Sequence, residues 1–179
     1  MLLQALMFAT PASAATWTVD HANSQLGFSV MWDREPFAGE FKAWQAEIKF
    51  DPADLSQAYA KITVDLASER SAEPDFDDGL KGVLGFEVSK FPQARFVTTR
   101  ISSRGGDAYT AEGTLTLRGI AKSISLPFTL TFAGTTAHMV GKAVVLRTDF
   151  GIGRGPWQAS APVAHTVTVT VDLRAAQVK

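Results

Sequence analysis

The chain has 179 residues and carries a net charge of -1 at neutral pH, with 17 Lys and Arg against 18 Asp and Glu. A length of roughly 100 to 200 residues suits one domain, and without a basic field to attract a polyanion we expect no nucleic-acid binding. The chain contains no cysteine, which excludes disulfides, thiolate metal sites and a cysteine nucleophile.

The first 14 residues, MLLQALMFATPASA, form a short apolar run that ends in a small-x-small pattern. Signal peptidases cut after such a pattern, so we predict a signal peptide over residues 1–14 and a mature domain over residues 15–179, outside the cytoplasm. No Lys or Arg stands near Met1, and the alternative is a disordered or helical N-terminal extension. A bilayer span needs about 20 apolar residues, so we expect no stable membrane insertion.

Apolar and polar residues alternate from residue 25 to residue 32, which predicts a strand with one buried face. The next predicted strand, residues 37–50, changes parity inside its length: apolar residues first occupy odd positions and then even ones. A parity switch within one strand indicates a β-bulge, here near Ala43 and Trp44. The apolar face of the first strand consists of Leu26, Phe28, Val30 and Trp32.

Residues 59–66 alternate again and predict a third strand. The pattern then breaks over residues 68–85, where apolar residues follow Pro74 at helical spacing. Proline fits the first turn of a helix, so we predict one short helix between Pro74 and Val83. Acidic residues stand near its positive N-terminal end, namely Glu73, Asp75, Asp77 and Asp78.

For the second half of the chain the sequence pattern predicts strands only. We predict strands over residues 95–102 and 108–118, and then a hairpin over residues 112–131 that reverses at Gly119, a residue free to adopt positive φ. Residues 137–147 and 163–173 complete the set. About eight long strands with a dry and a wet face favour an all-β fold with one short helix, an eight-stranded antiparallel barrel. Such a barrel is either filled by its own side chains or holds one small ligand.

Four segments in the expected order resemble the YceI-like family of bacterial periplasmic proteins. The segment GTLTLRGI…ISLP (residues 113–120 and 124–127) is similar to that family's G-x-L-T-I-R-G-V…V-x-L-P. The others are WTVD…SQLGF (17–20 and 24–28), FPQARF (91–96) and RTDFGI (147–152). The resemblance spans about nine-tenths of the chain. It implies a lipocalin-like barrel in the periplasm that holds an elongated polyisoprenoid or similar lipid.

The resemblance and the strand parity together predict which residues face a lipid in the lumen. A long-chain isoprenoid or fatty lipid bound there is the favoured ligand, and no other cofactor is expected. The predicted lumen residues are Phe28, Val30, Trp32, Phe41, Ile62, Val64, Leu66, Phe76, Leu80, Phe96, Leu115, Leu117, Ile124, Leu126, Phe128 and Phe150.

The chain departs from the family pattern near the expected opening. Trp32 stands where the family often has a histidine, and residues 76–80 read FDDGL where the family has R-D-x-H-L. A phosphate head selects Arg, Lys or clustered backbone donors, whereas this segment is acidic. We therefore favour a ligand with a neutral, quinone-like head over a prenyl phosphate, with Arg70 and Lys81 as partial counter-charges.

Little in the sequence supports catalysis or metal binding. The three histidines, His21, His138 and His165, lie in separate segments without metal-ligand spacing. We expect no catalytic residue and no metal site. Two other functions are left open: a quinone-holding accessory of a membrane redox protein, and a solid-core barrel acting as an interaction module. Pairing into a homodimer is open as well.

Overall fold

The structure is a computed structural model that describes residues 14–178. The predicted signal peptide thus lies outside the described residues except for Ala14. The one α-helix among the described residues is α1 (Pro74–Lys81), in agreement with the helix predicted behind Pro74. The strands are β1 (Thr16–Val19), β2 (Gln25–Trp32), β3 (Glu35–Phe41), β4 (Trp44–Lys49), β5 (Tyr59–Asp65), β6 (Glu69–Ser71), β7 (Gln93–Gly105), β8 (Ala108–Leu117), β9 (Ile120–Ala133), β10 (Thr136–Leu146) and β11 (Val163–Gln177).

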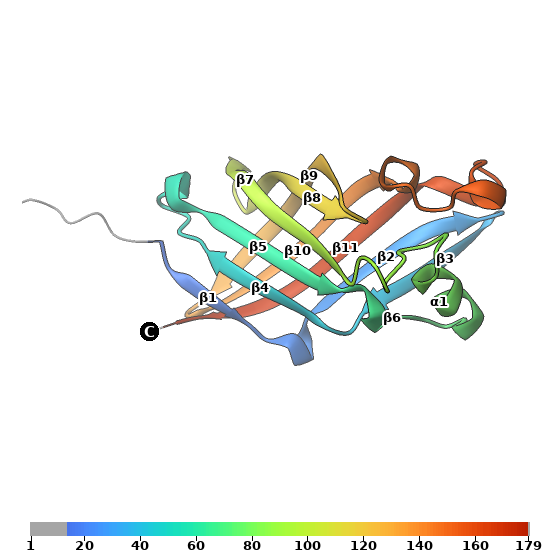
Figure 1. Cartoon of the computed structure of the whole chain (residues 1–179). Helices are drawn as coiled ribbons and strands as arrows, with labels where there is room; N and C mark the ends of the chain where they lie inside the picture. Colours follow the sequence, from blue (N-terminus) through green and yellow to red (C-terminus); the bar gives the residue numbers. More distant parts are fainter. Residues whose placement is uncertain (1–13, 179) are drawn as a thin grey trace, which may run out of the picture.

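Eight strands close into an antiparallel barrel, as predicted. Their order around the ring is β1-β4-β5-β7-β8-β9-β10-β11, and β11 pairs back with β1. Figure 1 shows this barrel with its long strands crossing the molecule obliquely. A second group of strands, β2-β3-β6, continues the sheet from β11 at the end of the barrel where α1 lies.

Two of the barrel walls are long strands that break in the middle. The first of these is β1 followed by β2, and both pair with β11. The second is β3 followed by β4: β3 pairs with β2, and β4 pairs with β1. The single strand predicted over residues 37–50 is therefore wrong in detail: it is two strands separated by Lys42 and Ala43. The Lys42 amide donates to the Ser68 carbonyl over 3.2 Å, and the Ala43 carbonyl accepts from the Asp65 amide over 3.0 Å. The predicted change of parity falls at this break.

The β8–β9 hairpin turns in two residues and includes Gly119, where the sequence analysis predicted the reversal. Leu117 pairs with Ile120, and the intervening Arg118 and Gly119 both have positive φ, 52° and 73°. That combination matches the right-handed twist of the flanking strands. The Arg118 guanidinium then bonds the carbonyls of Val83 and Gly85, so the hairpin holds the loop that follows α1.

Aromatic side chains close the end of the barrel opposite α1. The Trp17 indole N–H donates to the Phe50 carbonyl over 3.0 Å, and the Phe50 ring meets the Tyr109 ring edge-on with centroids 5.4 Å apart. Phe132 packs against both Trp17 and Phe50. Trp17 comes from β1, a strand of four residues that the sequence analysis did not predict. This short strand thus both closes the hydrogen-bond ring and plugs one end.

Candidate ligand cavity

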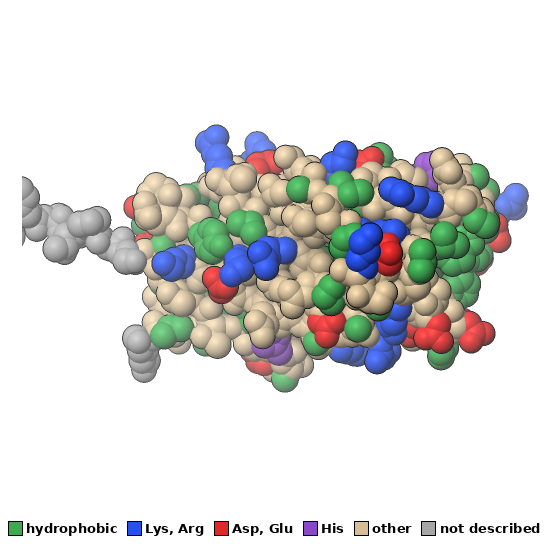
Figure 2. All heavy atoms as spheres, in the orientation of Figure 1, with side chains coloured by type: hydrophobic (Ala, Val, Ile, Leu, Met, Phe, Trp, Pro, Cys, Tyr) green, Lys and Arg blue, Asp and Glu red, His purple; other side chains and the backbone are tan. Residues whose placement is uncertain are grey.

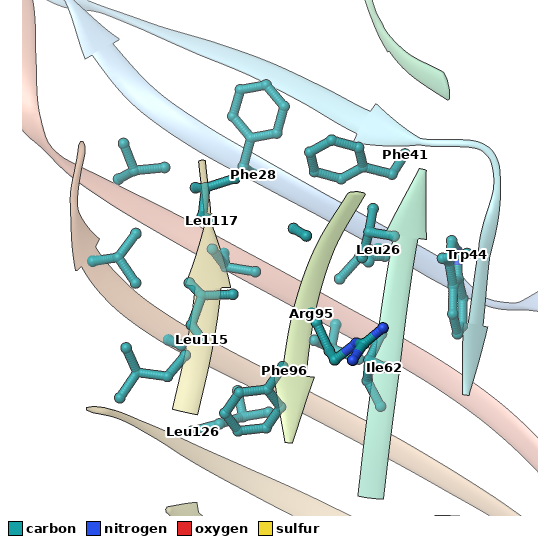
Figure 3. A pocket seen from close by; sticks show the side chains of 18 of the residues that line it. Leu26, Phe28, Phe41, Trp44, Ile62, Arg95, Phe96, Leu115, Leu117 and Leu126 are labelled. Carbon is teal, nitrogen blue, oxygen red and sulfur yellow. The ribbon is translucent and has the colours of Figure 1, made fainter. Parts of the chain in front are cut away.

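An apolar cavity of about 300 Å³ runs inside the barrel. Its wall consists of the inward-facing residues of successive strands, which stand in the lumen in Figure 3. A volume of this order lies at the lower end of the range of ligand pockets, about 300 to 1,000 Å³. The barrel is therefore not completely filled by its own side chains.

All sixteen residues predicted for the lumen line this cavity. They come from several strands, from α1 and from the segment after β10. Their contact with a ligand stays a prediction. The sixteen are Phe28, Val30, Trp32, Phe41, Ile62, Val64, Leu66, Phe76, Leu80, Phe96, Leu115, Leu117, Ile124, Leu126, Phe128 and Phe150.

The wall also contains residues that the prediction left out. The largest group comes from β11, whose alternation was evident in the sequence but whose side chains were not assigned to the lumen. Because β11 is the strand that joins both halves of the barrel, its inward face is central to the cavity. These additional residues include Trp17, Leu26, Trp44, Val167, Val169, Val171 and Leu173.

The α1 end of the cavity is covered by a second aromatic cluster. The Phe76 ring of α1 packs edge-on against Trp32, with ring centroids 4.4 Å apart. It also packs at a tilt against Phe37, with centroids 5.1 Å apart. Trp157 approaches from the other side, and its ring tip lies 3.4 Å from the point where a β-carbon on Gly79 would stand. Figure 2 shows apolar side chains gathered at this end of the molecule. α1 and the turn Gly155–Trp157 therefore meet over Trp32 as a cover.

Polar side chains on the wall are already engaged by the backbone or point outward. The Thr98 hydroxyl accepts from the Ala60 amide over 2.9 Å and donates to its carbonyl over 3.2 Å. Arg147, 5% exposed, donates to four backbone carbonyls over 2.9 to 3.0 Å. Burial lowers the pKa of Arg147. Arg95 is exposed, and its neighbours Ala94 and Phe96 occupy the inward positions of β7.

Close to the cover lies a buried carboxyl group that the sequence analysis did not single out. Glu69 on β6 is fully buried, and neither of its carboxyl oxygens has a hydrogen-bond partner among the described residues. Burial raises the pKa of Glu69 to about 7, with a further contribution from the nearby Asp77 carboxylate that Lys81 and Arg70 partly offset. The sequence pattern was uninformative here, because residues 68–85 were interpreted as a break between strands, whereas a strand of three residues lies within them.

The acidic residues of α1 divide into two groups. Glu73, Asp75 and Asp78 are exposed, as expected for charges near a helix N-terminus. Asp77 instead is 6% exposed and accepts hydrogen bonds from the Ser71 hydroxyl at 2.6 Å and the Ser71 amide at 3.0 Å. Asp77 therefore joins α1 to β6 and does not face solvent as its neighbours do.

The histidines lie apart from the cavity. His138 bonds Asp172 over 2.8 Å and His165 bonds the Gln158 carbonyl over 2.9 Å, while His21 packs on Trp44. Within residues 14–178, no three His, Asp or Glu side chains come together in a way that could hold a metal ion. Over the same residues the structure contains no helix of the length and apolar character that crossing a bilayer requires.

The fold and the cavity define an antiparallel barrel with an apolar interior, a plugged end and a helical cover. The model of the YceI-like domain family matches residues 17–175. The chain belongs to this family. The predicted recognition and fold class are thereby confirmed.

Relatives and solved structures agree with this assignment. The chain is 28% identical to a UPF0312 protein of Pseudomonas savastanoi pv. phaseolicola over 98% of this chain and 93% of that protein. It superposes on the crystal structure of Burkholderia cenocepacia BcnA with a TM-score of 0.85 and 32% identity, covering 88% of this chain and 99% of that one. A polyisoprenoid-binding domain from Saccharophagus degradans, implicated in plant cell wall breakdown, superposes with a TM-score of 0.72 and 14% identity, over 92% and 99% of the two chains. The last likeness shows a shared fold.

Proposed function

We propose that this protein binds and carries a long-chain isoprenoid lipid in the barrel cavity, without catalysing a reaction on it, and that it does so in the periplasm. The observation that carries the proposal is the apolar cavity that runs between an aromatic plug and a helical cover. The polyisoprenoid-binding domain from Saccharophagus degradans, which shares the fold, supports the same class of ligand. A cavity of this kind also argues against the solid-core interaction module.

Hydrophobic burial suffices to hold such a ligand. Removing ~400 Å² of lipid surface from water at about 25 cal/mol per Å² contributes roughly 10 kcal/mol before the costs of association. The site therefore needs few polar contacts, which agrees with a wall whose polar groups are already engaged elsewhere.

The head of the ligand is neutral in this proposal, and a quinone fits best. A phosphate needs free cationic or backbone donors, but the Arg147 guanidinium is directed to four backbone carbonyls. The exposed carboxylates of Glu73, Asp75 and Asp78 stand on the cover. Each would repel a phosphate by roughly 1 kcal/mol at 4 Å even with water-like screening.

Extraction of the purified protein with organic solvent, followed by mass spectrometry, tests the proposal. We expect an isoprenoid lipid in stoichiometric amount. Delipidated protein should then bind a ubiquinone more tightly than a prenyl phosphate of equal tail length at moderate salt. Absence of any lipid, with no binding of added lipid, would contradict the carrier function. Tighter binding of the phosphate would contradict only the neutral head.

A further inference from the structure

The buried side chain of Glu69 lies on the same face of the β2-β3-β6 extension as side chains that line the cavity. Residues directly opposite each other on antiparallel strands point to the same face of a sheet, and Glu69 pairs with Phe41, which pairs with Leu26, which pairs with Val171. Phe41, Leu26 and Val171 all line the cavity. Glu69 is thus the last and the only polar member of this row of four side chains, and it lies next to the cavity wall and is not itself part of it.

The carboxyl lies against the cavity wall at Phe28. Gly39 has no side chain, and the point where its β-carbon would stand is 2.8 Å from Glu69 Oε1 and 2.7 Å from the edge of the Phe28 ring. The Phe28 ring itself lines the cavity. A side chain at position 39 would therefore occupy the space in which the carboxyl and the ring edge meet.

The charged groups around Glu69 do not neutralise it. From α1 it is faced by Asp77 and Lys81, and from its own strand by Arg70. The Arg70 guanidinium donates to the backbone carbonyls of Ala67 and Glu69, and the Asp77 carboxylate bonds Ser71. Arg70 and Asp77 are thus bound elsewhere, and Lys81 makes no hydrogen bond to the Glu69 carboxyl. An uncompensated charge is costly in a buried position, so the neutral acid is the form that suits it.

A neutral carboxylic acid is a hydrogen-bond donor, and a buried donor without an acceptor loses free energy. We propose that Glu69 donates a hydrogen bond to an uncharged oxygen on the head of the bound lipid, such as a quinone carbonyl, and that ionisation of Glu69 releases that head. The proposal rests on the lipid-carrier function above. The head reaches the carboxyl by displacing the edge of the Phe28 ring.

This assignment fixes the orientation of the lipid in the cavity and makes its binding depend on pH. The head lies beside β6 and α1, under the cover, and the tail extends toward the aromatic plug. The pKa of Glu69, about 7, places the loss of the donor near neutral pH. Above that pH an oxygen acceptor would face a carboxylate, which offers no proton and repels it.

Competition binding to the delipidated full chain tests the role of Glu69. The two ligands are a short-tailed ubiquinone and an isoprenoid hydrocarbon of the same tail length, each displacing a fluorescent fatty-acid probe at pH 5.5 and at pH 8.5. The ubiquinone should bind about tenfold more tightly at pH 5.5 than at pH 8.5, which corresponds to about 1.4 kcal/mol, since ionisation removes the hydrogen bond and adds repulsion. The hydrocarbon should bind equally at both pH values.

Two substitutions of Glu69 distinguish the effect of its hydrogen-bond donor from the effect of its negative charge. Glu69→Gln keeps a donor that does not ionise, so it should retain the preference for ubiquinone and lose its pH dependence. Glu69→Leu should bind both ligands equally at either pH, and a thermal melt of each variant checks the fold.

The possible failures are distinguishable. Hydrocarbon binding without any preference for the ubiquinone at pH 5.5 would overturn the role of Glu69 and leave the carrier function standing. A pH dependence that persists in Glu69→Gln would overturn it too. Failure of the wild-type chain to bind either ligand would overturn the carrier function itself.

Discussion

Two buried ionisable residues at the α1 end of this barrel differ in how their polar atoms are bonded. Arg147 spreads its charge over four backbone carbonyls from the segments around residues 152 and 159–164, and a β-carbon on Gly153 would lie only 2.1 Å from its Nη1. Glu69 has no comparable set of donors. Arg147 therefore serves the architecture of the loop before β11, whereas the Glu69 side chain makes no hydrogen bond that explains its position in the fold.

The unpartnered carboxyl of Glu69 predicts a stability that falls as the pH rises. Its pKa is raised in the folded state, from 4.5 to about 7, so its contribution is fully present below pH 4.5 and is lost as the pH passes through 7. A difference of this size corresponds to roughly 3 kcal/mol. We expect Glu69→Leu to exceed the wild type in free energy of unfolding by roughly that amount more at pH 8.5 than at pH 4.5.

Urea unfolding at several pH values, followed by circular dichroism, measures this difference. Glu69→Gln is the matched control, because it keeps the shape of the side chain and removes the titration. A constant difference between the wild type and both variants from pH 4.5 to pH 8.5 would show that Glu69 does not change its pKa on folding.

Among the elements, β8 offers the clearest test of which face looks into the cavity. Leu117 lines the cavity, while Thr116 points to the opposite face and pairs with Arg95 of β7. Leu117→Glu would place an unpaired charge in an apolar lumen, which costs several kcal/mol. We expect this variant to lose lipid retention and to unfold at markedly lower urea concentration.

Thr116→Glu is the matched control on the adjacent residue. Its carboxylate would stand on the outer surface opposite Arg95, where a cross-strand charge pair changes the stability by less than about 1 kcal/mol. Lipid retention by mass spectrometry should be unchanged. Similar losses in both variants would mean that the assigned faces of β8 are wrong.

Regular elements of this fold could be predicted from the sequence because each long strand repeats one physical rule. A strand with one face in a lumen must alternate, and about seven or more residues made the alternation visible here. The β8–β9 hairpin was predictable for the same reason, with Gly119 marking the turn. Short elements carry no such pattern: β1 has four residues and β6 has three. Their places are fixed by pairing with β11, β4 and β3, which only the tertiary structure reveals.

The residues of the candidate site also differ in whether a local sequence pattern could predict them. Apolar lining residues such as Phe28 and Leu126 follow from strand parity, which is local. The importance of Glu69 follows from contacts between separate elements: the pairing with Phe41, the meeting of its carboxyl with the Phe28 ring edge beside Gly39, and the cover formed by α1. Burial of a glutamate against its ordinary preference is a property of the assembled barrel, so no pattern in the sequence indicated it.

At the scale of the whole molecule, the two ends of the barrel are closed by different structures. One end is plugged by Trp17, Phe50 and Tyr109, held by a buried hydrogen bond and edge-on rings. The other is covered by α1, which is joined to the sheet chiefly through β6. A lipid that fills the space between them contacts strands from every part of the ring, so its binding should stabilise the fold as a unit.

Bound lipid should therefore raise the unfolding temperature of the whole chain in one transition. A ligand that binds only the folded state at a free concentration 100 times its Kd adds about 2.7 kcal/mol to the stability. For a domain of roughly 150 to 250 residues, each kcal/mol shifts Tm by about 2 to 4 °C, which gives an expected rise of about 5 to 10 °C. Differential scanning calorimetry of delipidated and ubiquinone-loaded protein at pH 5.5 measures it. Leu117→Glu, which should bind no lipid, should show no rise under the same conditions. An unchanged Tm in wild-type protein that mass spectrometry shows to be fully loaded would mean that the lipid binds outside the barrel.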